Sequence, residues 1–286
     1  MGILGQVWLL FSILCVLVLL FFIVKTKSFS LNTKLKLNIG AFVGTMIVNY
    51  ATASGLISGL SQSEISQKYQ TMITPAGFAF SIWGVIYGLL ILSMIYWIWK
   101  KNDEDKQQLI HKLSPLIWAM FAVNIAWNIF FSVSMIAVSV ICILVYWVIL
   151  FLICRKIGNK ISLTTMAYGI HFGWISVASI VNFFALLVQI NNGELSNPEL
   201  WYVLALIFGI ILGFTLVILL GNVGIPLAMA WAYFGIFMRL NDTKPDSLLV
   251  SMIALTGIVS LIALTIGAFV GVHWGNLFQK IFFKQK

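Results

Sequence analysis

The sequence has little charge for its length. Only 9% of its 286 residues are Asp, Glu, Lys or Arg, whereas 61% are hydrophobic and the mean hydropathy is +1.04. A soluble globular domain does not need so much apolar surface. The composition therefore predicts an integral membrane protein with several spanning helices.

Acidic residues are missing from the interior of the long apolar segments. The eight of them lie in loops or at expected helix ends: Glu64, Asp103, Glu104, Asp105, Glu194, Glu199, Asp242 and Asp246. Ion-coupled transporters usually carry an ionisable group inside the membrane, and here only His171 lies deep in an apolar segment. The paired broken helices of many secondary transporters are also missing. A conventional pump is therefore not expected.

The three cysteines have no spacing that indicates a disulfide framework or a metal site. Cys15, Cys142 and Cys154 fall inside or at the edge of apolar segments, without a CxxC or CxxH pattern. Such cysteines are most simply small apolar residues. We expect no metal and no resident cofactor.

About nine apolar segments are long enough to cross a bilayer, which takes about 20 residues per helix. They cover residues 7–24, 36–58, 76–99, 112–132, 134–154, 163–189, 200–219, 223–239 and 248–272. The connections at 132–134 and 221–224 are very short, so the helices that flank each of them should form adjacent hairpins. The first segment lacks the basic start and the cleavage signal of a signal peptide. The sequence thus predicts an all-α, polytopic transmembrane bundle.

Positive charge is distributed unevenly between the loops. If the N-terminus lies outside, all 17 lysines and arginines except Lys68, Arg239 and Lys244 fall on the inner side. Cytoplasmic loops of membrane proteins carry such an excess. The net charge of +9 therefore predicts an outside N-terminus and a cytoplasmic C-terminus, and does not indicate nucleic-acid binding. Richness in Lys, Ile and Phe and the lack of organelle targeting favour a bacterial plasma membrane.

Three stripes of aromatic and polar residues follow the i, i+3, i+4 spacing of a helix face. They consist of Phe80, Trp83 and Tyr87; of Asn124, Trp127, Asn128 and Phe131; and of His171, Trp174, Ala178 and Asn182. At about 1.5 Å rise per residue, Trp83, Asn124 and Asn182 lie roughly 12 Å below the outer helix ends. Asn49, on another expected helix, lies at about 15 Å. Groups from four helices thus share one depth.

Two interpretations of these residues are open. A buried amide is costly in hydrocarbon unless it has a partner, so the asparagines could serve only to join helices. Alternatively, tryptophans that lie deeper in the membrane than the usual interfacial belt line an apolar pocket with a few polar groups. The candidate ligand-binding residues are Asn49, Phe80, Trp83, Tyr87, Asn124, Trp127, Asn128, His171, Trp174, Ala178 and Asn182. No residue is a catalytic candidate.

GxxxG pairs raise a similar choice. They include Gly40/Gly44, Gly55/Gly59, Gly169/Gly173, Gly209/Gly213 and Gly267/Gly271. Small residues at this spacing let helices approach closely, either within the chain or at a dimer face.

The stripes also carry a resemblance to a known family. Asn124-Ile-Ala-Trp127, followed by Phe130-Phe131, resembles the Asn-x-x-Trp…Phe-Phe helix of the TspO/MBR family, the tryptophan-rich sensory or translocator proteins. Trp174-x-x-x-Ala178-x-x-x-Asn182 resembles the last core helix of that family, and Pro75 with Trp83-x-x-x-Tyr87 resembles its second helix. Order and spacing agree over residues 36–190. The chain departs from the family at Ala76, Phe78 and Ile170-His171, where Pro, Trp and Pro-Tyr are usual.

This resemblance implies a five-helix bundle, often a homodimer, with a cavity for porphyrins, sterol-like lipids or aromatic molecules. A loop that covers the cavity corresponds to residues 60–74, which we expect to act as a flexible lid. The chain would comprise an N-terminal helix and basic inner loop (1–35), a TspO-like core (36–190) and a three-helix extension (191–286). The expected partners are membrane lipid, a flat hydrophobic molecule such as a tetrapyrrole, and a second copy of the chain.

Three functions are compatible with these features. The first is a sensor or carrier that binds the flat ligand. The second is an enzyme that degrades porphyrin, as suggested for family members, and the third is a transporter of small hydrophobic metabolites. The enzyme has the least support, because His171 is the only acid or base in a span and no nucleophile has a paired base. We favour the first.

Overall fold

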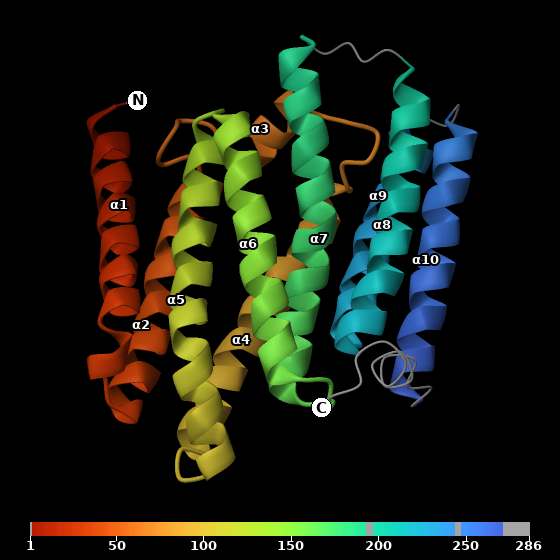
Figure 1. The fold of residues 1–286 in the computed structure, drawn as a ribbon. Coiled ribbons are helices and arrows are strands. Elements are labelled where there is room, and N and C mark those ends of the chain that lie inside the picture. The colour runs from red at the N-terminus through yellow and green to blue at the C-terminus, as the bar shows by residue number, and fades with distance from the viewer. Residues whose placement is uncertain (1, 193–196, 244–246, 271–286) are drawn as a thin grey trace. The chain divides into compact units, whose positions relative to one another are not determined.

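The computed structural model describes residues 2–192, 197–243 and 247–270. Among these residues the chain forms ten α-helices and two short 3-10 helices (Figure 1). In chain order they are α1 (Ile3–Val24), η1 (Thr26–Ser28), α2 (Leu31–Ala53), α3 (Gln62–Lys68), η2 (Gly77–Ser81), α4 (Ile82–Trp99), α5 (Glu104–Ser132), α6 (Ile136–Ile157), α7 (Leu163–Ile190), α8 (Pro198–Leu220), α9 (Gly224–Thr243) and α10 (Leu248–Phe269). Outside the described ranges lie four residues named above, Glu194, Lys244, Asp246 and Gly271, and three of the basic residues counted on the inner side, Lys280, Lys284 and Lys286.

The described helices confirm the predicted all-α membrane fold. Every described α-helix except α3 corresponds to one of the expected segments. Seven are long and apolar enough to cross a membrane: α1, η2 with α4, α5, α6, α7, α8 and α10. Helix α2, which carries Lys34 and Lys36, and helix α9, which ends near Arg239 and Asp242, are outside this group. The protein is thus a multi-pass membrane protein.

Several helices begin and end where local chemistry dictates. The Ser30 hydroxyl accepts a hydrogen bond from the main-chain N–H of Thr33 and caps α2, and Asp103 caps α5 through the N–H of Lys106. These side chains satisfy N–H groups that have no partner in the first turn. Helix α8 ends at Leu220, and its cap residue Gly221 has the left-handed conformation, which glycine adopts without strain.

The second expected span ends earlier than its apolar pattern predicts. Helix α2 stops at Ala53, whereas the pattern continued to residue 58. Gly55 and Gly59 both have positive φ, at 78° and 84°, so they lie in a turn and are not a helix-packing pair.

The expected lid contains a short helix rather than only a flexible loop. Helix α3 begins with a capping box in which Ser61 and Glu64 bond to each other's main-chain N–H groups. Ile65 and Tyr69 then pack with Ile136 and Ala185 in a small buried cluster. The capping box and the buried apolar residues explain why so short a helix forms here.

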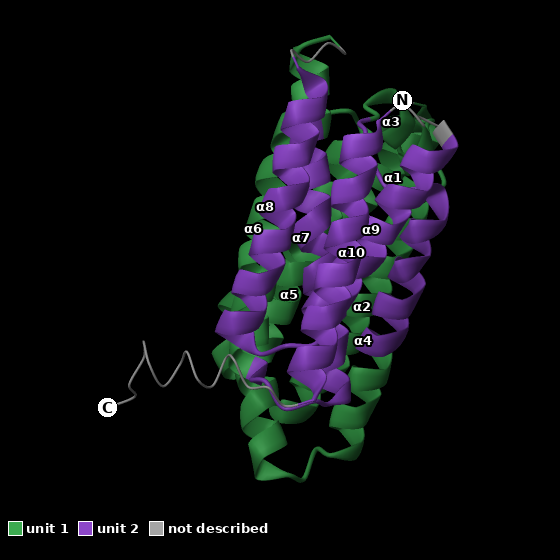
Figure 2. Cartoon of the chain, turned by 90° about the vertical axis from the view of Figure 1, so that its right-hand side faces the viewer, with its two compact units in different colours: residues 1–70, 91–156, 185–193 green, residues 71–90, 157–184, 194–286 purple. Residues whose placement is uncertain are grey.

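The chain divides into two compact units (Figure 2). Unit 1 comprises residues 1–70, 91–156 and 185–193, and unit 2 comprises 71–90, 157–184 and 194–286. Helices α4 and α7 each begin in unit 2 and end in unit 1. The division into residues 1–35, 36–190 and 191–286 follows family resemblance and stays a prediction.

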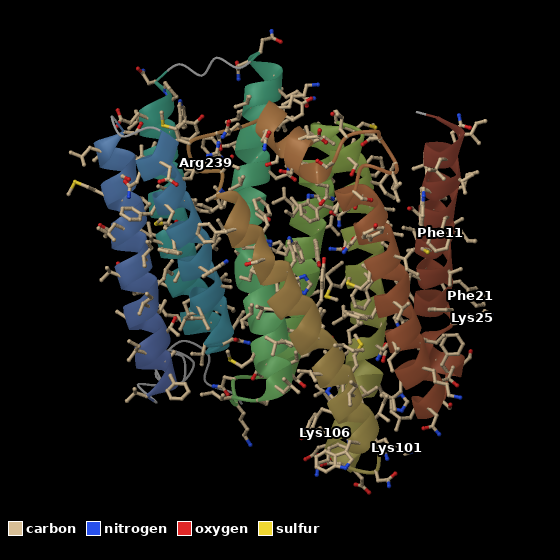
Figure 3. All side chains as sticks on the ribbon, turned by 180° about the vertical axis from the view of Figure 1, so that it is seen from behind. Phe11, Phe21, Lys25, Lys101, Lys106 and Arg239 are labelled. Carbon is tan, nitrogen blue, oxygen red and sulfur yellow. The ribbon has the colours of Figure 1, made fainter. Side chains whose placement is uncertain are left out.

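Unit 1 is organised around α5, which packs against α1, α2 and α3. Three hydrogen-bonded pairs join α2 to α5 in the same order along both helices: Lys34–His111, Asn38–Ser114 and Asn49–Asn128. The two helices therefore run parallel. Along α1, Leu10 and Phe21 are 66% and 55% exposed, which suits a helix that faces lipid. Phe21 is labelled in Figure 3.

Basic residues gather at one end of unit 1. This end is formed by the end of α1, the start of α2, the turn between α4 and α5, and the end of α6. It carries Lys25, Lys27, Lys34, Lys36, Lys100, Lys101, Lys106, Lys112, Arg155 and Lys156, three of which are labelled in Figure 3. Lys68, in α3, lies at the opposite end of the unit. Within this unit the helices thus separate the charges as the loop pattern predicted.

Unit 2 is held together by close helix contacts at glycines. Helices α8, α9 and α10 pack against one another. A side chain at Gly209 or Gly257 would collide with Tyr233, whose hydroxyl donates to the main-chain carbonyl of Leu206. Likewise, Gly169 and Gly173 of α7 lie against Asn222 and Ile225. The GxxxG pairs Gly169/Gly173 and Gly209/Gly213 therefore serve contacts within unit 2.

Candidate functional site

The candidate residues fall into two groups, one in each unit. Unit 1 contains Asn49, Asn124, Trp127 and Asn128. Unit 2 contains Phe80, Trp83, Tyr87, His171, Trp174, Ala178 and Asn182.

The asparagines of unit 1 form a hydrogen-bond network centred on Asn128. Its side-chain nitrogen lies 3.0 Å from Oδ1 of Asn49, 3.0 Å from the main-chain oxygen of Asn124 and 3.2 Å from Oδ1 of Asn124. Asn124 in turn donates across 3.1 Å to the hydroxyl of Tyr146 in α6. Asn124 and Asn128 are 1% and 5% exposed. The network thus joins α2, α5 and α6, which supports the helix-joining interpretation of these amides.

Gln62 of α3 completes this network. Its side-chain nitrogen donates across 2.6 Å to Oδ1 of Asn128 and across 3.3 Å to Oγ1 of Thr52. No sequence pattern predicted Gln62, Thr52 or Tyr146 as members of this network. The Ser61-x-x-Glu64 pattern is a capping-box signal that places a helix start here, but nothing in the sequence pairs Gln62 with a residue of α5.

Trp127 adds an aromatic ring next to this hydrogen-bond network. Its ring lies 6.5 Å from that of Tyr146, in a tilted arrangement. Trp127 is half-buried, whereas Tyr146 is fully buried. Unit 1 therefore places a partly accessible indole beside the hydroxyl that Asn124 binds.

The candidate residues of unit 2 form an aromatic cluster around Trp83. The Trp83 ring stacks on Tyr87 at 5.3 Å, with a 26° angle between the planes. It lies edge-on to His171 at 5.8 Å and to Trp174 at 6.3 Å. Phe80 contacts Trp174 at 5.6 Å. The structure thus brings together the stripes expected on the third and sixth spans.

Exposure differs sharply within this cluster. His171 and Trp174 are 1% and 3% exposed, Trp83 and Tyr87 are half-buried, and Phe80 is 41% exposed. The accessible rings therefore rest on a buried layer from α7. Asn182, one turn beyond the half-buried Ala178 on α7, is buried at 4% exposure.

Helix α9 holds the segment that leads into α4. The N–H of Ala76 donates to the carbonyl of Gly235 across 2.9 Å, and the Trp231 indole donates to the carbonyl of Ala79 across 2.9 Å. The Arg239 guanidinium donates to the carbonyl of Thr74 across 3.2 Å. No sequence motif predicted a role for α9. In the structure α9 orders residues 74–79, which precede the aromatic cluster in the chain.

No group of three or more His, Cys, Asp or Glu side chains within the described ranges could hold a metal ion. Cys15, Cys142 and Cys154 are free thiols.

Fold and composition define a multi-pass helical membrane protein, and a comparison with protein-family models identifies its family. Residues 35–270 match the model for TSPO-like protein, so the chain belongs to the TSPO-like family. The resemblance inferred from the sequence is thus confirmed, and the match extends through α8, α9 and α10. Comparisons with the curated proteins and with the solved structures gave no match.

Proposed function

We propose that this TSPO-like membrane protein binds a flat hydrophobic ligand and acts as a sensor or carrier for it. A tetrapyrrole is the first candidate, and sterol-like or other aromatic molecules are alternatives. The observation that carries the proposal is the contact of Trp83 with Tyr87, His171 and Trp174 in unit 2.

The two layers of this aromatic cluster, accessible rings on buried rings, suit a flat ligand. A partly exposed ring that lies on buried rings has little freedom to move, so it offers a flat ligand a preformed surface. Aromatic rings contribute large contact areas and prefer stacked or edge-on contacts, which suit a planar ligand. Among the candidate residues of unit 2, the accessible rings are Phe80, Trp83 and Tyr87, and the buried rings are His171 and Trp174.

Family resemblance supports two further parts of the proposal. TspO/MBR proteins often form homodimers, so we propose a second copy of the chain as partner. We also propose that the basic end of unit 1 faces the cytoplasm of a bacterial cell, because basic residues favour that side.

The test is a titration of protoporphyrin IX into the full chain in lipid nanodiscs, followed by porphyrin fluorescence. Trp83→Ala should weaken saturable binding by about tenfold or more, the equivalent of about 1.4 kcal/mol. Trp201→Ala is the matched control, because Trp201 is 51% exposed and lies at the start of α8. Equal affinities for the parent chain and Trp83→Ala would contradict the site, and the absence of saturable binding by the parent chain would contradict the proposed tetrapyrrole ligand.

A further inference from the structure

Two oxygen atoms near α3 face the same donor. Oδ1 of Asn128 and Oγ1 of Thr52 both accept hydrogen bonds from the side-chain nitrogen of Gln62, at 2.6 Å and 3.3 Å. All three residues belong to unit 1.

The hydrogen-bonding character of Asn128 is fixed by its other neighbours. Its side-chain nitrogen lies 3.0 Å from the main-chain oxygen of Asn124. A main-chain carbonyl can only accept a hydrogen bond, so the Asn128 side chain cannot be turned around without loss of that bond. Oδ1 of Asn128 must therefore face Gln62 as an acceptor.

Thr52 is constrained in the same way. Its hydroxyl donates to the main-chain oxygen of Asn49 across 3.0 Å, and a hydroxyl has a single proton to donate. Toward Gln62 it can therefore offer only a lone pair. Thr52 is fully buried, so no solvent is available to replace a missing donor.

We propose that these two oxygens are a binding subsite for a hydrogen-bond donor, which the Gln62 side chain fills when no ligand is bound. A ligand that displaces Gln62 would carry an N–H or O–H group, such as an aromatic amine, an amidine or the N–H of an open-chain pyrrole. A carboxylate or a ketone at this position would face two acceptors and be rejected. This inference rests on the proposed function only for the class of ligand, a flat hydrophobic molecule, and it concerns a site within unit 1.

Gln62 can leave without loss of α3. The helix is also anchored by Ile65, which is fully buried in the cluster with Ile136 and Ala185. Gln62 is half-buried on the first turn, and its long side chain has several rotamers. Rotation of one side chain therefore exposes the subsite.

A flat ligand would also find aromatic surface in this network. Asn128 connects through Asn124 to Tyr146, and Tyr146 neighbours the half-buried Trp127. The same group of residues thus combines two acceptors with an indole, the pairing that a planar molecule with one N–H group would use.

Three anthracenes of one shape test this specificity. 2-Aminoanthracene, 2-methylanthracene and anthracene-2-carboxylate would be titrated into the full chain in nanodiscs and followed by fluorescence anisotropy, with empty nanodiscs subtracted. We expect the amine to bind at least tenfold more tightly than its methyl isostere, because a site built for a hydrogen bond rejects a ligand that cannot make it. The carboxylate should bind most weakly.

Variants separate the subsite from general apolar binding. Gln62→Leu removes the internal competitor and should strengthen binding of the amine severalfold without strengthening that of the methyl compound. Gln67→Leu is the matched control, because Gln67 is an exposed glutamine of the same helix. Thr52→Val should reduce the preference for the amine.

The outcomes distinguish the two proposals. Equal binding of amine and methyl compound in the parent chain and in Gln62→Leu would overturn the donor subsite and leave the aromatic ligand class standing. If none of the three anthracenes bound saturably, the proposal of a flat aromatic ligand would fail together with the subsite.

Discussion

The indole nitrogen of Trp231 donates a hydrogen bond to the main-chain carbonyl of Ala79 across 2.9 Å. The two residues are 152 positions apart in the chain, in α9 and in the 3-10 helix that precedes α4. A helix beyond the stretch that carries the sequence motifs therefore fixes the start of an aromatic helix. This relationship gives α9 a structural role that can be measured.

Trp231→Phe should destabilise the protein by about 1 kcal/mol, the usual contribution of one hydrogen bond. The substitution keeps an aromatic ring next to Phe78 and Phe234 and removes only the N–H group and part of the ring. Thermal unfolding in detergent measures the change. Trp201→Phe, at an exposed position, should leave the unfolding temperature unchanged, and an equal shift in both variants would refute the assignment.

Close packing at Gly173 should be intolerant of a methyl group. A Cβ at this position would meet the main-chain oxygen of Ile225, which has no rotamer through which to move away. Gly173→Ala should therefore cost about 1–3 kcal/mol of unfolding free energy, as overpacking does. Gly84→Ala is the control, since nothing lies within 4 Å of its added Cβ. It should be neutral or slightly stabilising, because alanine favours a helix.

The cap of α3 should depend on pH through Glu64. Hydrogen bonds from the Ser61 hydroxyl and from its main-chain N–H, both at 2.7 Å, hold the pKa of Glu64 below its ordinary value. A lowered pKa means that the stabilisation is present above the unfolded-state pKa, about 4.3, and is lost as pH falls through the folded-state pKa. Hydrogen exchange of residues 62–68, corrected for its intrinsic pH dependence, should accelerate at acid pH.

Glu64→Gln provides the control for this effect. Glutamine can also serve at the third position of a capping box, and it does not titrate. The pH dependence of exchange should therefore disappear in this variant. If it persisted unchanged, another group would be responsible.

The separation of charge in unit 1 predicts its orientation in the membrane. Lys68 and Lys101 are both exposed, and they lie at opposite ends of the unit. A membrane-impermeant maleimide added to intact bacterial cells should label Lys68→Cys but not Lys101→Cys, whereas both should react after the cells are broken. Labelling of the native cysteines, Cys15, Cys142 and Cys154, is measured in the parent chain and subtracted as background. Labelling of Lys101→Cys but not Lys68→Cys in intact cells would contradict the predicted topology.

The long helices were predictable because each depends on its own sequence. A run of about 20 apolar residues is driven into a helix by the bilayer alone, so the expected segments correspond to α1, α2 and α4–α10. Two boundaries were predicted poorly. Helix α2 ends at Ala53 and not at residue 58, because glycines with positive φ follow inside the apolar run. Helix α5 begins at Glu104 and not at residue 112, because Asp103 caps it within a polar segment. Helix α3 was not predicted, since a polar segment of this length forms a helix only where a cap and a buried anchor such as Ile65 meet.

The candidate residues were predictable as groups but not in their contacts. Helical spacing put Trp83 with Tyr87 and Asn124 with Asn128, and the structure keeps both pairs in contact. The partners from distant segments, Gln62 and Trp231, left no periodic signal. Spacing along one helix identifies its faces, whereas the residue that meets a face depends on how other helices pack.

The sequence by itself therefore determined that this is a helical membrane protein. It also determined where most spans lie and which loops carry the basic residues. These properties follow from transfer free energies and charges that add up residue by residue. Only the tertiary structure decided that the side-chain oxygen of Asn128 faces Gln62, 66 residues away. A buried amide must take whichever partner the packing brings within about 3 Å, and no local rule specifies that partner.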